Sequence, residues 1–204
     1  MSDKIKEVNK IDQNPQFQTQ SNNNYLLLDS LSKLSINIMQ SISELEQNDF
    51  CTLLEIINSE DSPEQKLNNI YNNPVFGNVH NSLLSFGEYI QVNNIQRFLG
   101  DDDAKQYLTH RILTDLEIDI YAPNNDPCAI YKASLSKCAI DYAICLLGAI
   151  GTGATPLGYC ILLFCQLSVA QCLDLAAKSS PNCVSASSRY QLIINPILYN
   201  INNC

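Results

Sequence analysis

Residues that would point to a chemical activity are scarce in this chain of 204 residues. It has two histidines, His80 and His110, and neither lies at a spacing from another ligand residue that suits a metal site. A catalytic cysteine needs a histidine nearby as its base, and the pattern offers none. The sequence also lacks the C-x2-C pairs that are typical of structural zinc sites. We therefore expect no enzyme, no metal site and no cofactor.

Basic residues are few, and the acidic residues gather in the front of the chain. Residues 1–124 hold 8 Lys and Arg against 18 Asp and Glu, a net charge of −10, whereas residues 125–204 hold 4 against 3, a net charge of +1. Nucleic-acid binding needs clustered Lys and Arg that displace counterions from phosphates. We therefore expect no nucleic-acid partner, and we expect a chain of two unlike parts.

Known export signals are missing as well. The first residues, MSDKIKEVNKIDQNPQFQTQ, contain neither the apolar stretch nor the cleavage site of a Sec signal peptide, and the sequence has no twin arginine. Two interpretations remain open. Either the protein is secreted after processing by a dedicated non-Sec route, or it stays cytoplasmic or membrane-associated with reduced cysteines.

The front part reads as an acidic, helical domain. Residues 1–24 are rich in Asn and Gln and are predicted to be a disordered lead, because they have little apolar surface to bury. Over residues 25–117 the apolar residues recur at helical spacing, and further helices are predicted over 82–99 and 103–117. The segment SPEQ, residues 62–65, predicts a helix start with a capping box. The first helical stripe consists of Leu31, Leu34, Ile38, Ile42 and Leu45.

A run of three carboxylates, Asp101 to Asp103, allows two interpretations. It could bind a divalent cation, or it could form the first turn of the following helix, where acidic side chains stabilise the positive end of the helix dipole. We favour the helix interpretation, since charged first turns are common.

Residues 118–127 are predicted to be a linker, open to proteolysis, because Pro123 and Pro127 interrupt regular backbone pairing. The part that follows, residues 128–204, holds eight of the nine cysteines. In a short secreted module this density favours a disulfide scaffold. The alternative is that the cysteines are free and simply serve as small buried hydrophobes.

An uncharged stretch runs from Tyr142 to Leu173 and is long enough to span a bilayer. The segment GTGATP in its middle predicts a chain reversal, because Gly151 and Gly153 favour a turn and Pro156 suits the first position of a helix. We therefore predict a small helical hairpin, with helices over 134–150 and 156–178. The fold class is expected to be all-α, an acidic helical bundle plus this Cys-rich hairpin module.

The cysteine spacing supports the hairpin. Within each predicted helix two cysteines lie seven residues apart and so share a face. Facing residues of an antiparallel hairpin have a constant index sum, which is 310 for two pairs and 311 for an outer pair. Six cysteines allow fifteen pairings, of which we favour this nested set. We expect Cys51 to lie outside it and Cys160 to pair with Cys204 or to stay free. The favoured pairs are Cys128 with Cys183, Cys138 with Cys172, and Cys145 with Cys165.

A polar or acidic front part followed by a C-terminal module rich in Cys, Gly, Ala and Leu resembles halocin-type bacteriocin precursors of the Cys-rich, microhalocin-like kind. The local likeness lies in "EIDI" and in "AICLLGAIGTGATPLGYCILLFC", and it covers about the last 80 residues. The resemblance implies that the C-terminal peptide is released as an antimicrobial and that the N-terminal part serves as a leader or immunity domain. The missing twin arginine and C-x2-C pairs depart from the family pattern.

We therefore expect the precursor of a disulfide-rich peptide that acts on a target-cell membrane, with a processing protease and an exporter as further partners. The alternative is a non-enzymatic, membrane-associated or cytosolic interaction protein with reduced cysteines. Membrane insertion of the hairpin would bury an apolar set that consists of Leu146, Leu147, Ile150, Leu157, Ile161, Leu162, Leu163 and Phe164.

Overall fold

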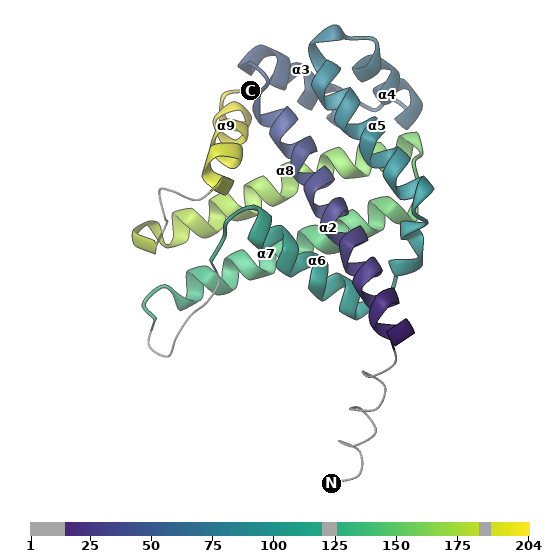
Figure 1. Cartoon of the computed structure of the whole chain (residues 1–204). Helices are drawn as coiled ribbons and strands as arrows, with labels where there is room; N and C mark the ends of the chain where they lie inside the picture. Colours follow the sequence, from purple (N-terminus) through teal and green to yellow (C-terminus); the bar gives the residue numbers. More distant parts are fainter. Residues whose placement is uncertain (1–14, 120–125, 184–188) are drawn as a thin grey trace.

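The computed structural model describes residues 15–119, 126–183 and 189–204, although not the side chains of 15–22, 189 and 190. Every regular element in these ranges is a helix (Figure 1), which confirms the prediction of an all-α fold.

Helix α2, Pro15–Ser43, is the longest element and crosses the molecule. Its first ten residues correct the prediction of a disordered lead that reaches residue 24, whereas residues 1–14 lie outside the described part. Once the packed second half of a helix has formed, each further residue adds a hydrogen bond at little cost, so even a polar segment can continue it. Tyr89, on the later helix α5, Gly77–Val92, fastens that helix to α2 by donating its hydroxyl hydrogen to the carbonyl oxygen of Leu27 at 2.9 Å.

Four short helices follow α2. They are α3, Gln47–Asn58; α4, Pro63–Tyr71; α5, Gly77–Val92; and α6, Asp102–Asp115, with the 3-10 turns η1, Pro74–Phe76, and η2, Ile95–Phe98. The capping box predicted at α4 is present, because the Ser62 hydroxyl accepts from the Gln65 backbone N–H and the Gln65 side chain accepts from the Ser62 N–H. The helix predicted over 82–99 is instead divided, since Asn94 takes a left-handed conformation with φ 48°.

The three aspartates form a helix start. The Asp101 carboxylate accepts from the backbone N–H groups of Asp103 and Ala104, at 2.9 and 3.0 Å, and Asp102 pairs with Lys105. Among the described residues no group of His, Cys, Asp and Glu side chains is arranged to hold a metal ion.

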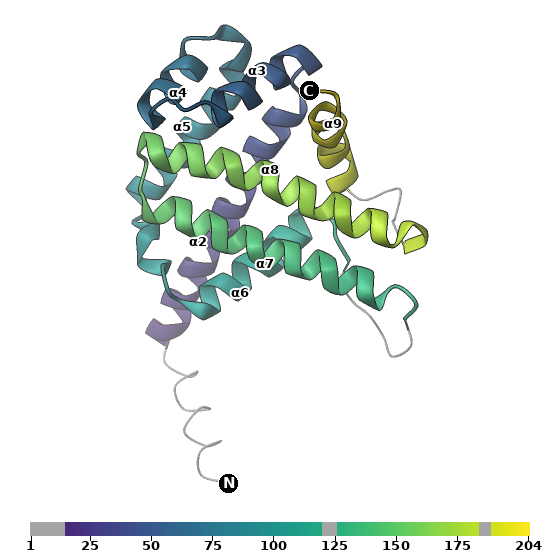
Figure 2. The ribbon, with the colours of Figure 1, turned by 180° about the vertical axis from the view of Figure 1, so that it is seen from behind.

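The predicted hairpin is formed by α7, Ala129–Gly151, and α8, Pro156–Ser179, which lie side by side (Figure 2). Gly153 makes the reversal with φ 73°, and the Thr155 hydroxyl caps α8 by accepting from the Gly158 N–H at 3.2 Å. A side chain at Gly158 would meet the carbonyl oxygen of Gly153 at 2.3 Å, so the tight turn requires glycine there as well.

The last helix, α9, Arg189–Asn203, was not predicted. Pro196 lies inside it, and a proline normally marks a helix end. Packing overrides that signal, because Ile193, Ile194 and Ile197 are buried against the rest of the protein.

The two parts of the sequence share one apolar core. Helix α6 packs on α7, α4 packs on α8, and α9 packs on α8, α2 and α3. The predicted domain at 25–117 and the predicted module at 128–204 therefore differ in sequence but pack against each other. The linker residues 120–125 lie outside the described part.

Candidate functional site

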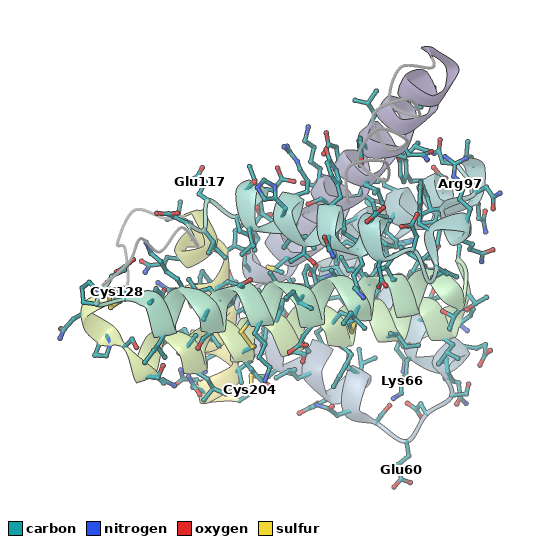
Figure 3. The ribbon with its side chains drawn as sticks, turned by 90° about the horizontal axis from the view of Figure 1, so that it is seen from below. Glu60, Lys66, Arg97, Glu117, Cys128 and Cys204 are labelled. Carbon is teal, nitrogen blue, oxygen red and sulfur yellow. A yellow bond between two sulfur atoms is a disulfide. The ribbon has the colours of Figure 1, made fainter. Side chains whose placement is uncertain are left out.

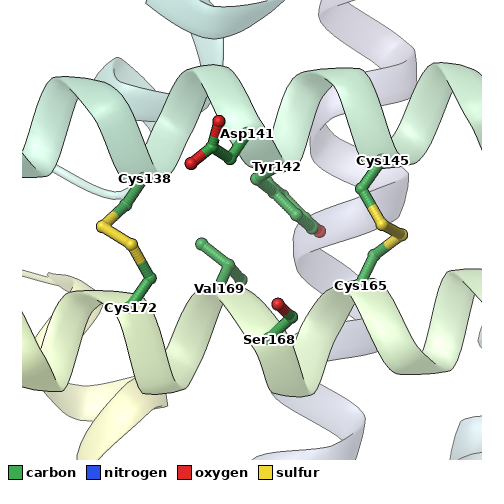
Figure 4. A pocket seen from close by; sticks show the side chains of 8 residues that line it. All are labelled: Cys138, Asp141, Tyr142, Cys145, Cys165, Ser168, Val169 and Cys172. Carbon is green, nitrogen blue, oxygen red and sulfur yellow. A yellow bond between two sulfur atoms is a disulfide. The ribbon is translucent and has the colours of Figure 1, made fainter.

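Three disulfides hold the hairpin together, and they join the cysteines in the pairs that the index sums favour. The Cα–Cα distances are 5.5 Å for Cys128–Cys183 and 5.8 Å for both Cys138–Cys172 and Cys145–Cys165. The two inner bridges lie like rungs between α7 and α8 (Figure 4). They follow from the seven-residue spacing, which turns both cysteines of each helix toward the partner helix.

The prediction that Cys51 stays outside the disulfide framework is wrong. Cys51 is bonded to Cys204, with a Cα–Cα distance of 5.3 Å, whereas Cys160 is free. This bond was missed because helix α9 was not predicted. Helix α9 brings Cys204 to the first half of α3, where Cys51 lies. Two hydrogen bonds mark this approach: the Gln47 side chain donates to the Asn203 carbonyl oxygen at 3.1 Å, and the Asn200 amide donates to the Leu45 carbonyl oxygen at 3.3 Å.

A cleft of about 180 Å³ lies between the two inner bridges (Figure 4). Asp141 and Ser168 are among the polar side chains that line it, and no described histidine reaches it. The lining residues are Cys138, Asp141, Tyr142, Cys145, Cys165, Ser168, Val169 and Cys172.

Cys160 keeps a free thiol, which is half-buried. It donates to the Pro63 carbonyl oxygen, 3.9 Å from the sulfur, and burial raises the pKa of the thiol. A raised pKa disfavours the thiolate, which is the reactive form. Of the two histidines, His80 stacks on Tyr71 with ring centroids 3.8 Å apart.

The interior of the hairpin contains one buried polar pair. The Tyr142 hydroxyl donates to the Gln166 side-chain oxygen at 2.5 Å, and burial raises the pKa of Tyr142. The Gln166 amide nitrogen has no hydrogen-bond partner. A buried polar group without a partner costs stability, so the Tyr142–Gln166 bond is lost only at a cost. The bond therefore fixes how α7 packs on α8, and substitutions of either residue should be poorly tolerated.

The residues predicted to insert into a membrane fall into three groups. Ile161 is half-buried, and only Leu157 and Phe164 are exposed, by 48% and 57%. The other five therefore cannot meet a lipid while the N-terminal helices cover them. These buried five are Leu146, Leu147, Ile150, Leu162 and Leu163.

The side of the hairpin that faces away from the N-terminal helices carries a row of exposed apolar side chains, which we call the outer face. Figure 3 has α7 and α8 in the foreground, as seen from below. Three of its members were missed by the sequence reasoning, although they recur at helical spacing and could have been found on a helical wheel. The outer face consists of Ile130 and Ile144 on α7 and Leu157, Phe164 and Leu175 on α8, whereas the exposed Ile140 lines a groove beside α6.

By length and composition both α7 and α8 could cross a membrane, and half of the most apolar window of each is buried in the fold. Core helices of soluble proteins share these properties, so this is weak support for a membrane span. Lys137 and Asp141 also lie on the exposed side of α7.

No family model matches the chain, and neither a curated protein nor a solved structure matches it.

Proposed function

We propose that this protein is the precursor of a disulfide-rich, antimicrobial peptide, in which the bridged hairpin acts on target-cell membranes and the N-terminal helices keep it inactive. The observation that carries the proposal is the two-sided hairpin. One side presents the exposed outer face, and the other presents a larger apolar surface that α2, α4 and α6 cover.

The outer face is suited to the first contact with a membrane. Phe164 and Leu175 project from α8, and Ile130 and Ile144 project from α7, with exposed fractions from 49% to 80%. Each apolar side chain that moves from water into lipid contributes about 1.5–3 kcal/mol. Together with Lys137, which can reach lipid phosphates, these residues form the amphipathic surface of an interfacial hairpin.

The covered side supplies the second step. When the N-terminal helices separate from the hairpin, Leu146, Ile150 and Leu162 lose the cover that now hides them completely. At about 25 cal/mol per Å² such surface strongly favours a lipid environment over water. Each helix is about 35 Å long, close to the thickness of a bilayer core of about 30 Å.

Release requires a cut, and the linker 118–127 is the segment for which we propose it. Asp119 and Asp126, on the two sides of residues 120–125, both lie near the Lys132 amine, at 3.6 and 3.0 Å. Proteolysis there would separate the parts in sequence without disturbing α7. A processing protease and a non-Sec exporter are the partners that this proposal requires, and the released peptide would be secreted.

A second candidate is a non-enzymatic interaction protein, membrane-associated or cytosolic, with reduced cysteines. It is favoured by the burial of half of each apolar helix window, as in the core of a soluble protein. Intact mass of protein from its natural source distinguishes the two. The precursor has four bridges and gains about eight mass units on reduction, about two for each bridge, whereas the reduced protein gains none.

The function is tested by dye leakage from vesicles of phosphatidylglycerol and phosphatidylcholine. The protein carries a protease site in the linker and the changes Cys51→Ser and Cys204→Ser, which remove the covalent connection between the parts. We expect leakage after cutting and little before it. Phe164→Ser should weaken leakage by about ten-fold, because it removes an apolar anchor from the outer face.

Val92→Ser is the matched control, because Val92 is 83% exposed but belongs to α5, in the part that the cut separates from the hairpin. It should leave leakage unchanged. If the cut protein causes no leakage, or if Phe164→Ser and Val92→Ser behave alike, the hairpin is not the membrane-active element.

A further inference from the structure

We propose that the Cys51–Cys204 bridge is a reducible latch, so that the hairpin is released only when the linker has been cut and a thiol reductant has opened this one disulfide. The proposal rests on the proposed function, because it concerns how the membrane-active part leaves its cover. It does not follow from the sequence pattern, since the bridge depends on the position of α9.

The connectivity makes this bridge different from the others. Cys128–Cys183, Cys138–Cys172 and Cys145–Cys165 all lie within the part that follows the linker. Cys51–Cys204 alone, among the four, joins that part to the N-terminal helices, across a sequence separation of 153. Any cut between Cys51 and Cys128 therefore gives two chains that remain covalently joined. Proteolysis is necessary for release but not sufficient.

Accessibility also sets this bridge apart. Cys204 is exposed and follows the end of α9, and Cys51 is half-buried on α3. Both inner rungs have one nearly inaccessible residue, since Cys138 is 3% exposed and Cys165 is 1% exposed. Thiol–disulfide exchange requires that the attacking thiolate reach a sulfur atom. Cys204 is therefore the one exposed cysteine among the eight bridged residues, whereas the rung cysteines line the cleft between the bridges.

The contacts around Cys204 are suited to separation. The two hydrogen bonds between this end of α9 and the region of α3 start from the side chains of Gln47 and Asn200. Gln47 is exposed, so water can replace its bond at little cost. Once the sulfurs part, the buried Asn200 bond to the Leu45 carbonyl oxygen and the packing of α9 are the contacts that remain.

The reductant is a small dithiol or a dithiol protein, and the reaction is balanced as follows. A thiolate of the dithiol attacks the Cys204 sulfur and forms a mixed disulfide with it. This step expels the Cys51 thiolate, and the expelled thiolate takes up a proton. The second thiol of the reductant loses its proton and attacks the mixed disulfide, which expels the Cys204 thiolate. The protein gains two electrons and two protons, and the dithiol becomes a disulfide. The two inner rungs of the hairpin are left intact.

The order of reduction is measured by timed alkylation. Oxidised protein carrying Cys160→Ser, which removes the free thiol, is treated with limiting dithiothreitol, quenched with iodoacetamide and mapped by mass spectrometry. We expect Cys51 and Cys204 to be alkylated at least about ten-fold faster than Cys138, Cys172, Cys145 and Cys165. Equal rates, or rungs that open first, would overturn the latch. The Cys128–Cys183 bridge lies within one part, so its rate does not affect the result.

A second measurement connects the latch to release. After a cut at an engineered linker site, the two parts should run as one species on a non-reducing gel and as two after limiting dithiothreitol. The cut protein should bind anionic vesicles only after this treatment, whereas the Cys51→Ser, Cys204→Ser variant should bind without it. If the reduction order holds but neither form binds vesicles, the proposed function fails and the latch stands. If both forms bind without reductant, the function stands and the latch fails.

Discussion

The two parts of the chain reach a stable fold by different means. The hairpin consists of two long apolar helices that three disulfides join, whereas the N-terminal part consists of α2 and four shorter helices with no bridge among them. Cys51, the cysteine of that part, bonds to the other part instead. The N-terminal helices therefore depend on packing, and the hairpin has covalent constraints that remain after it leaves its cover.

The bridges close loops of very different size. The sequence separations are 20 and 34 residues for the rungs, 55 for the outer hairpin bridge and 153 for the latch. In the chain-entropy model these loops correspond to about 3, 4, 4 and 5 kcal/mol of stabilisation. The latch thus stabilises the intact precursor more than either rung does. Its contribution disappears when the linker is cut and the latch is reduced.

Complete reduction should have the largest effect. Reducing all bridges with a phosphine should lower the free energy of unfolding by more than about 5 kcal/mol, because the unfolded chain regains the entropy of four closed loops. Denaturant unfolding with and without the reductant measures this loss. The Cys160→Ser variant is the control, because it removes a free thiol and no bridge and should leave the free energy of unfolding unchanged. If α7 and α8 keep their hydrogen-exchange protection after reduction, the bridges are not what distinguishes the two parts.

A cavity in the hairpin should come next. Leu162 is fully buried and Leu157 is 48% exposed, and both are leucines of α8. Leu162→Ala should cost about 3 kcal/mol, because it removes buried methyl groups and leaves a void. Leu157→Ala should change stability by no more than about 0.5 kcal/mol. Chemical denaturation of both variants measures the difference, and equal costs would mean that the assigned buried and outer sides of α8 are wrong.

Alkaline pH should weaken the hairpin through Tyr142. Burial raises the pKa of its hydroxyl in the folded protein, whereas an unfolded tyrosine titrates near about 10. The stability that this group provides is therefore complete below about pH 10 and is lost as the pH rises toward the folded pKa, by up to about 1.4 kcal/mol per pH unit.

Tyr142→Phe should flatten the pH dependence above about pH 10, although it also costs stability at neutral pH by leaving the Gln166 oxygen unpaired. Tyr71→Phe is the comparison in the N-terminal part, where burial raises the pKa of Tyr71 to about 12. Below about pH 11 both tyrosines stay protonated in the folded protein, so the two variants should flatten the profile by similar amounts. Unfolding curves from pH 8 to about pH 11 measure both, and a profile that Tyr142→Phe leaves unchanged would contradict the burial of its hydroxyl.

The helix caps should give the smallest effects and the most local comparison. Ser62 caps α4 and Thr155 caps α8, and each accepts one backbone N–H. Ser62→Ala and Thr155→Ala should each cost about 1 kcal/mol. Hydrogen exchange should show fraying over the first turn of α4, whereas α8 should fray less because the Cys145–Cys165 rung lies close to its start. Equal fraying would mean that the rungs do not stiffen the hairpin ends.

Local chemistry made the hairpin predictable. Gly153, Thr155 and Pro156 specify the reversal, and the seven-residue cysteine spacing then leaves few ways to pair two antiparallel helices. Likewise, Ser62 and Gln65 mark the start of α4 within three residues of each other. Each of these features depends on residues that are close in sequence.

The features that were missed depend on packing between distant segments. Helix α9 forms despite Pro196 because three isoleucines are buried against other helices, and it alone brings Cys204 to Cys51. The members of the outer face recur at helical spacing, but which side of each helix stays uncovered depends on the packing of the N-terminal helices. The helical start of α2 at Pro15 also runs against its polar composition.

Tryptophan fluorescence tests most directly whether the outer face of the released hairpin meets lipid. The chain contains no tryptophan, so Phe164→Trp introduces a single reporter on the outer face, and Val92→Trp places one on α5 as the control. Both are made in the cut protein with Cys51→Ser and Cys204→Ser, and both are mixed with vesicles that contain brominated acyl chains. We expect a blue shift and strong quenching for the Phe164→Trp variant after cutting, and neither for the Val92→Trp variant. An unshifted, unquenched Phe164→Trp variant, or equal quenching of the two, would contradict a membrane-active hairpin.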